Sequence, residues 1–459
     1  MRYRKLFIVL LLLIFTLNSC KVLKPEYSQP DADQTLFRDL AVSDSANLSD
    51  VPWRQLFTDP YLQSMIEKTL TNNPDLQIAV ARMNRAEANF RQSKAEFFPS
   101  LNAGFNGVFQ NLGEDGQEIP ELYQLFGSTS WEADIWGKLR NAKRASLASF
   151  MASEAFTRAI TTELIASVSV NYYILLALDA QLEITENTLE KRIRNAETME
   201  VLKDNDVITG ADLVLSQANR YSTEILIPDL EHRIYETENI LSLLMGQNPG
   251  PIKRSRLEEQ ELSPDLKTGV PVQILANRPD VQEAEYRLRS AYEMTNVARS
   301  YFYPSLTINA RSGITETSLE NLLSARFVFW SITGGLTQPV FNKGLNKQRL
   351  RVAVAEYQES RAVFKRILLT AGEEVVNSMH NYQTATDKIA IREKQIEYLE
   401  KSVEYTMELL KYTSNTNYID VLTSEVNLLQ AQLNRVNDKL EQLQAIVTLY
   451  QSLGGGWKY

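Results

Sequence analysis

The chain has 459 residues, a formal net charge of −9 at pH 7, 44% apolar residues and a mean hydropathy of −0.26. The acidic balance argues against a nucleic-acid binder, which needs a basic face to meet phosphates. The hydropathy argues against a transporter built from many apolar helical spans. One Cys and two His residues supply neither a zinc cluster nor a disulfide framework, so we expect no metal and no bound cofactor.

Residues 1–19 have the pattern of a secretory signal peptide. Basic residues precede an apolar run, Leu6 to Leu17, that is shorter than the ~20 residues needed to span a bilayer. The run leads into Leu17-Asn18-Ser19-Cys20, which resembles the lipobox of bacterial lipoproteins, in which the Cys becomes the lipidated first residue. We therefore expect a covalent lipid on Cys20 and an extended tether over 20–50. An unlipidated signal peptide with a chance Cys is the alternative.

The rest of the chain contains one tandem duplication. Asn73-Pro74-Asp75-Leu76-Gln77 recurs 205 residues later as Arg278-Pro279-Asp280-Val281-Gln282. Leu244-Met245-Gly246 recurs 208 residues later as Ser452-Leu453-Gly454. These intervals predict two long repeats rather than a solenoid of short ones. We place the repeats at 51–246 and 271–459, with a Pro-rich linker over 247–270 that lies outside the helices as an equatorial segment.

Each repeat holds two segments with the two-residue period of a β-strand. Tyr123 to Ile135 alternates apolar and polar residues, as do Leu101 to Asn106 and Leu306 to Arg311, and Phe327 to Val340 alternates in its second half. The longer segments reach the length of a transmembrane strand. Four strands cannot close a barrel, and lipid tolerates no open edge, so three copies with twelve strands are needed if the apolar face meets lipid. A soluble four-stranded sheet packed on helices fits the composition equally well.

Two unusually long helices follow the strand pairs. No Pro interrupts Lys138–Lys203 or Lys343–Tyr412, and each would span about 100 Å at ~1.5 Å per residue. Each continues into a shorter helix, over Asp212–Met245 and Asp420–Leu453. The uncharged stretch Leu164–Leu178 is too short and too polar to cross a membrane, and we expect it to pack against neighbouring subunits.

Several motifs, in order and at matching spacing, resemble the TolC-like outer-membrane efflux factors, particularly their lipoprotein (NodT-type) branch. They are Trp131-Glu132-Ala133-Asp134-Ile135-Trp136-Gly137-Lys138, Asn277-Arg278-Pro279-Asp280-Val281, Tyr303-Pro304-Ser305-Leu306, Pro339-Val340-Phe341-Asn342-Lys343-Gly344 and Leu453-Gly454-Gly455-Gly456-Trp457. The resemblance implies a mainly α protein with membrane β: a homotrimer with a twelve-stranded barrel in the outer membrane and a twelve-helix α-barrel in the periplasm. It also implies a passive exit duct that works with a periplasmic adaptor and an inner-membrane efflux transporter.

The resemblance places the channel constriction at the turns between long and short helices, over 204–210 and 413–417. In relatives, an Asp-Val-Leu after the second turn brings an acidic ring to the constriction, and here Asp420 occupies that position. Asp212 is its counterpart in the first repeat. Thr423 stands where relatives often carry a second acid, and Glu425 is the candidate to compensate. Both Asp residues also suit the positive end of a helix dipole, which is a purely structural explanation.

Glu132 and Asp134 lie on the polar face of a strand, and we expect them to point into the barrel lumen. No residue sits in a recognised catalytic setting, so we expect no enzyme. The alternative function is a lipid-anchored coiled-coil scaffold of the cell envelope, which the long helices fit but the alternating strands and the duplication do not.

Overall fold

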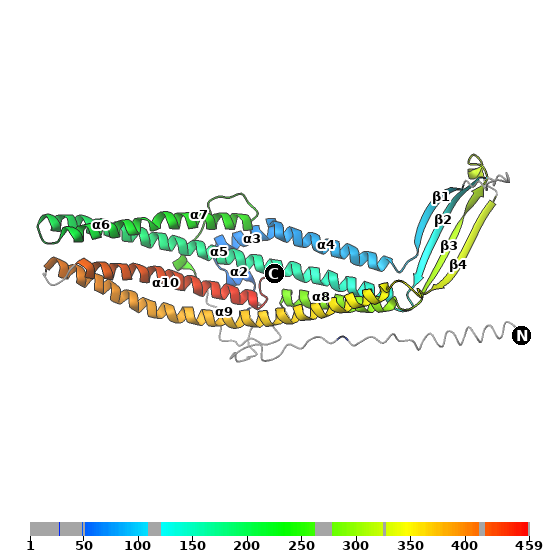
Figure 1. The fold of residues 1–459 in the computed structure, drawn as a ribbon. Helices are drawn as coiled ribbons and strands as arrows, with labels where there is room; N and C mark the ends of the chain where they lie inside the picture. The colour runs from blue at the N-terminus through cyan, green and yellow to red at the C-terminus, as the bar shows by residue number, and fades with distance from the viewer. Residues whose placement is uncertain are drawn as a thin grey trace. The chain divides into compact units, whose positions relative to one another are not determined.

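A computed structural model describes residues 27, 48, 51–108, 121–261, 278–324, 327–412 and 418–457. Cys20 and the signal peptide lie outside the described residues. In chain order the elements are α2 (Trp53–Leu56), α3 (Pro60–Asn72), α4 (Pro74–Ala95), β1 (Ser100–Val108), β2 (Leu122–Ala133), α5 (Lys138–Asp204), α6 (Gly210–Glu224), α7 (Leu226–Leu244), η3 (Leu257–Glu259), α8 (Pro279–Ser300), β3 (Ser305–Glu316), η5 (Leu322–Ser324), β4 (Phe327–Thr337), α9 (Leu345–Tyr412) and α10 (Tyr418–Ser452) (Figure 1).

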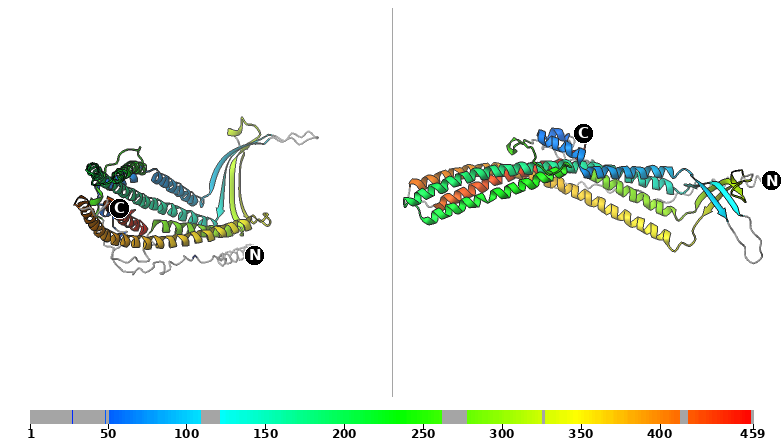
Figure 2. Two further views of the ribbon diagram at one scale, coloured as in Figure 1. Left: turned by 60° about the vertical axis from the view of Figure 1, so that its left-hand side comes forward. Right: turned by 90° about the horizontal axis from the view of Figure 1, so that it is seen from above.

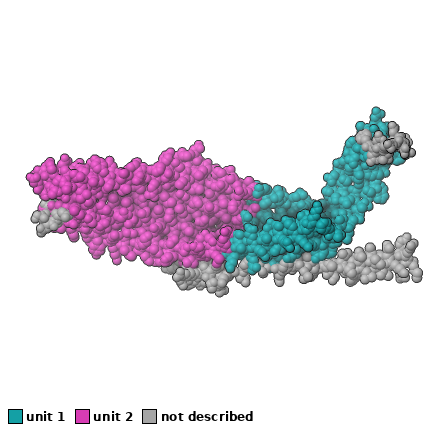
Figure 3. Space-filling model, in the orientation of Figure 1, with its two compact units in different colours: residues 1–31, 83–152, 284–365 teal, residues 32–82, 153–283, 366–459 magenta. Residues whose placement is uncertain are grey.

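The chain divides into two compact units, and each unit takes segments from both repeats (Figure 3). Unit 1 includes 83–152 and 284–365, and so contains all four strands. Unit 2 includes 32–82, 153–283 and 366–459, and contains the turns between long and short helices. The repeats are therefore interleaved in space, because each long helix begins in one unit and ends in the other.

The tandem duplication is confirmed by matching elements and by matching contacts. Helices α4 and α8 both have 22 residues, and the long helices α5 and α9, continuous in both views of Figure 2, have 67 and 68. In the first repeat, Asn73 Nδ2 donates to the Leu244 carbonyl at 2.9 Å. In the second, Arg278 Nη1 donates to the Ser452 carbonyl at 2.8 Å. Equivalent positions thus close equivalent helix ends with different side chains, since helix C-termini leave carbonyls without intrahelical partners.

The shorter helix differs between the repeats. In the second repeat it is the single helix α10, of 35 residues, but in the first it is broken into α6 and α7 at Ile225. The prediction of one helix over Asp212–Met245 was wrong at this point. Pro228 explains the break, because proline lacks an N–H and its ring clashes with the carbonyl four residues earlier, which belongs to Glu224 at the end of α6.

The four strands form one antiparallel sheet in the order β1-β2-β3-β4, with 9, 12, 12 and 11 residues (Figure 1). Side chains alternate between two faces, as the sequence predicts. The apolar face is exposed: Leu101 is 83% exposed, Trp330 75% and Ile332 68%. Among the residues that the structure describes, no layer of α-helices covers this face, so the alternative of a soluble sheet packed on helices is not what forms.

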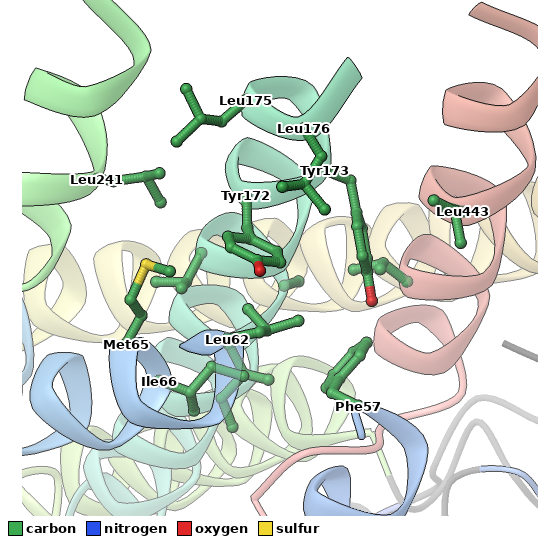
Figure 4. Close-up of a cluster of buried hydrophobic side chains, with 14 of the residues drawn as sticks. Phe57, Leu62, Met65, Ile66, Tyr172, Tyr173, Leu175, Leu176, Leu241 and Leu443 are labelled. Carbon is green, nitrogen blue, oxygen red and sulfur yellow. The ribbon is translucent and has the colours of Figure 1, made fainter. Parts of the chain in front are cut away.

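The main hydrophobic core lies in unit 2, where α2 and α3 pack against α5, α7 and α10 (Figure 4). Tyr172, Tyr173 and Leu176 of α5 are fully buried there beside Leu62 and Leu241. One described helix, α5, has a window apolar enough to cross a membrane, and 61% of that window is buried inside the molecule. Most residues of the stretch Leu164–Leu178 are themselves buried in the single chain, so the stretch packs mainly within its own chain and not, as the sequence predicts, against a neighbouring subunit.

Candidate functional site

The turn between α5 and α6 is closed by a capping box. Asp206 adopts a positive φ of 55°, and Thr209 then caps α6. The Thr209 hydroxyl accepts from the Asp212 amide at 3.3 Å, and the Asp212 carboxylate accepts from the Thr209 amide at 3.0 Å and its hydroxyl at 2.7 Å. This reciprocal arrangement satisfies helix N–H groups that otherwise have no partner. The Asp212 carboxylate is thus bound to its own helix start.

The second turn, over 413–417, lies outside the described residues, and α10 begins just after it at Tyr418. Asp420 stands in the first turn of α10 and is exposed, as is Thr423 one turn further along. Tyr418 and Val421, in contrast, are buried. A rotation of about 100° per residue places Asp420 and Thr423 on one face of α10, away from the buried face.

A small apolar cluster holds this end of the helices together. Met199 of α5, Leu410 of α9, and Tyr418 and Val421 of α10 form its buried part. Partly buried side chains from α6 and the first turn complete it, namely Ile208 and Leu213. Because the cluster joins both helical hairpins, it fixes the direction in which the exposed face of α10 points.

A polar cluster lies next to it, between α5 and α10. Glu425 of α10 accepts a short hydrogen bond from Asn195 Nδ2 of α5. Arg192, only 5% exposed, donates from Nη1 to the Asn219 carbonyl of α6 at 3.0 Å and also to the Thr223 hydroxyl. Together these contacts tie α5 to both shorter helices. A cavity of about 200 Å³ adjoins them.

Burial dominates the electrostatics of this polar cluster. It raises the pKa of Glu425, with Arg192 and the Asn195 hydrogen bond acting in the opposite direction. Burial lowers the pKa of Arg192, against the attraction of Glu425. Glu425 lies five residues from Asp420, about 140° around α10, so the two carboxylates do not share a face. The structure places Glu425 between helices, whereas its predicted part at a constriction remains a prediction.

The acids predicted for the barrel lumen lie at the junction of β2 and α5. Glu132 pairs with Lys138 Nζ at 2.8 Å. Asp134 lies beyond the end of β2, and its carboxylate accepts from the amides of Leu139 and Arg140 at 2.9 and 3.1 Å. These contacts give both acids a structural role in starting α5. Among the described residues there is no group of three or more His, Cys, Asp or Glu side chains that could hold a metal ion.

Comparison with known proteins decides the family. The family model described as "Outer membrane efflux protein" matches this chain twice in succession, over residues 65–247 and 270–455. The chain belongs to the outer membrane efflux proteins. The two matched segments correspond to the two repeats, so each repeat by itself matches the family model.

Two curated relatives in this family have nearly the length of this chain. "Probable outer membrane lipoprotein SilC" of Salmonella typhimurium is 29% identical over 396 residues, which cover 84% of this chain and 85% of the relative. "Probable efflux pump outer membrane protein TtgC" of Pseudomonas putida is 26% identical over 465 residues, with 96% and 94% covered. Matches at this length include both repeats, so the likeness is not confined to one motif.

Solved structures of such channels share the fold. The outer-membrane channel OprN superposes with a TM-score of 0.87 at 25% identity, covering 95% of this chain and all of OprN. CusC, from a study of conformational changes that accompany folding and transmembrane channel formation, gives a TM-score of 0.85 at 24% identity with the same coverage. The recognised family and its mainly α fold with membrane β-strands are therefore confirmed.

Sequence reasoning missed Arg192 and Asn195. A signal for Arg192 exists in the seven-residue spacing of Leu178, Thr185, Arg192 and Met199, all of which are buried in α5. Such spacing keeps side chains on one seam of packed helices. This seam is hard to recognise in the sequence, because one of its four residues is Arg192 and arginine is rarely fully buried.

Proposed function

We propose that this outer membrane efflux protein is the exit duct of a tripartite pump, a passive homotrimeric channel that carries small molecules to the outside. An inner-membrane transporter supplies the energy, and a periplasmic adaptor joins it to the duct. The observation that carries the proposal is the four-stranded sheet with an exposed apolar face in a chain whose family is the outer membrane efflux proteins.

The sheet itself supports a trimer. Within the described ranges, its outer strands β1 and β4 each have a pairing partner on one side only. Within a bilayer every backbone polar group needs a partner, so an open edge is not viable and the sheet must close into a barrel. Pairing β1 of one copy with β4 of the next closes the sheet, and three copies give twelve strands. A barrel of this size is wider than the eight-stranded ones that side chains fill, and so leaves a lumen.

The helix turns supply the periplasmic constriction. Asp420 and Thr423 share the exposed face of α10, and three symmetry-related Asp420 carboxylates would form an acidic ring that favours cations. Asp212 contributes less, because its carboxylate is held in the capping box of α6. We assign Glu425 to the contact between the two hairpins.

Anchoring and cargo complete the proposal. A lipid on Cys20 would hold the N-terminus in the outer membrane beside the barrel, consistent with a relative named as a lipoprotein. Relatives are named both for cation efflux and for toluene efflux. One fold thus serves unlike cargo, and we assign cargo choice to the inner-membrane transporter. A coiled-coil scaffold is disfavoured, because it has no use for an apolar transmembrane sheet.

The test is Asp420→Ala in the full-length lipoprotein, with Asp229→Ala as a control that removes an exposed acid from the first turn of α7. We expect Asp420→Ala to raise single-channel conductance, to lower the preference for cations and to change efflux in cells. Asp229→Ala should do none of these. A monomeric protein whose conductance and efflux are the same with and without Asp420 would contradict the proposal.

A further inference from the structure

A charged residue, Arg311, lies on the face of the sheet opposite the apolar one. Arg311 of β3 is aligned with Ser128 of β2 and Ser331 of β4, and directly opposite residues of antiparallel strands point to the same face. It lies near the middle of its strand. A charged side chain facing lipid at that depth is strongly disfavoured. Arg311 therefore faces the lumen of the proposed barrel.

Two aromatic rings hold the guanidinium in place. Its central carbon lies 3.6 Å from the centre of the Phe126 ring and 5.5 Å from that of Phe329. Nη2 donates to Gln124 Oε1 at 3.2 Å. Guanidinium groups stack on aromatic faces through cation–π attraction, which is strongest where water is excluded. Arg311 is accordingly half-buried.

Two glycines make room for this arrangement. A side chain at Gly104 would place its Cβ 2.6 Å from the tip of the Phe126 ring. A side chain at Gly313 would place its Cβ 2.3 Å from the Leu125 carbonyl and 2.7 Å from Phe126 Cβ. Neither distance is compatible with an ordinary contact. The absence of side chains at Gly104 and Gly313 on the neighbouring strands therefore leaves room for the Phe126 ring, on which the Arg311 guanidinium stacks.

No acidic side chain of the described residues neutralises the charge of Arg311. No salt bridge to Arg311 occurs within the described ranges, and Glu132, the acid on the same face of β2, is paired with Lys138. The polar partner is the neutral amide of Gln124. Because arginine stays protonated at all physiological pH values, the site carries a permanent positive charge.

We propose that Arg311, held against the wall by Phe126 and Gln124, forms a cationic ring midway along the barrel lumen that binds anions and favours their passage. This inference rests on the proposed trimeric duct, which places three copies of Arg311 around one lumen. The duct would then carry an acidic ring at its periplasmic end and a basic ring near its exit. Any substrate passing the basic ring in anionic form would be attracted to it.

The experiment measures the reversal potential of the reconstituted full-length protein in a tenfold KCl gradient. We compare the wild type with Arg311→Gln and Arg311→Lys, each also in an Asp420→Ala background so that the periplasmic end does not limit the current. In water, the attraction between two opposite unit charges in contact raises the probability of that contact about fivefold. Arg311→Gln should therefore shift the K⁺ to Cl⁻ permeability ratio roughly fivefold toward K⁺, and Arg311→Lys should retain most of the wild-type ratio. Lys68→Gln, which removes an exposed charge from α3, should leave the ratio unchanged.

Arg311→His provides a test within a single folded protein. Its imidazole titrates between pH 5 and 8, so selectivity should change toward Cl⁻ on acidification while the wild type stays constant over the same range. A permeability ratio that is the same in Arg311→Gln and wild type, or independent of pH in Arg311→His, would overturn the cationic ring and leave the exit duct intact. Absence of any conductance in the wild type would overturn both.

Discussion

Asp59 should be among the most sensitive polar positions in unit 2. It is 7% exposed and caps α3, accepting from the amides of Tyr61 at 2.8 Å and Leu62 at 3.4 Å. Its second oxygen accepts from the Tyr172 hydroxyl at 2.6 Å and from Gln260 Nε2 at 2.9 Å. One carboxylate thus joins α3, the long helix α5 and the segment that follows the first repeat.

Asp59→Ala removes all of these contacts at once. Loss of the helix cap costs about 1 kcal/mol. Leaving the buried hydroxyl and amide with fewer partners costs roughly 1–3 kcal/mol more, because Tyr172 still accepts from the Ser255 amide and Gln260 still reaches the Arg256 carbonyl. The total is about 2–4 kcal/mol. For a unit of this size that lowers the Tm by about 3–7 °C.

The assay is thermal unfolding of the detergent-solubilised protein followed by tryptophan fluorescence, since Trp53 is buried in the same core. Asp59→Asn keeps the capping oxygen and should lose about half as much, because the amide nitrogen that replaces the second oxygen can accept neither from the Tyr172 hydroxyl nor from Gln260 Nε2. Asp229→Ala, an exposed acid in the first turn of α7, should change the Tm by less than about 2 °C. An Asp59→Ala protein that unfolds within 1 °C of the wild type, roughly the error expected of such a scan, would refute this reasoning.

Two further predictions concern the helix contacts. Burial raises the pKa of Glu425, so the folded protein favours the protonated carboxyl. The resulting stabilisation of the folded state is complete below the ordinary pKa of 4.5 and is lost as the pH rises through the raised pKa. Glu425→Gln should therefore flatten the dependence of Tm on pH above 4.5, and an unchanged slope would contradict this. Gly246 has a φ of +65°, and a Cβ there would lie 2.6 Å from the Asn72 carbonyl. Gly246→Ala should cost about 1–3 kcal/mol in the same unfolding assay, whereas Gly250→Ala, which meets only Asn248 at 4.0 Å, should cost little.

The sequence predicted the duplication, the strand pairs and the long helices because each leaves a repeated or periodic signal. Asn73 and Arg278 occupy equivalent positions in the two repeats but differ in residue type. Each donates a hydrogen bond to a carbonyl at the end of an equivalent helix, so the contact is kept although the side chain has changed. Periodicity reports that a face is buried. Neither periodicity nor an uncharged stretch such as Leu164–Leu178 indicates whether the same chain or a neighbouring subunit covers the face.

The polar contacts were less predictable for a different reason. Arg192 and Glu425 look like solvated helix charges in the sequence, and only the packing of three helices shows that they are enclosed. The same holds for Phe126 and Arg311, which lie far apart in the chain and meet only through the pairing of β2 with β3. Acids at helix starts, such as Asp212, can be located from the sequence. The sequence does not distinguish an acid that caps its helix from one that lines a gate, because both roles use the same residue type at the same position.

The central claim is that three copies of this chain form one channel. Light scattering combined with negative-stain microscopy of the detergent-solubilised protein tests it most directly. We expect a particle with three times the protein mass of one chain, whose image has threefold symmetry and is longer than about 100 Å, the length of helix α5 at ~1.5 Å per residue. A monomer, or a thin two-stranded rod, would contradict it, because neither can close the edges of β1 and β4 within a membrane.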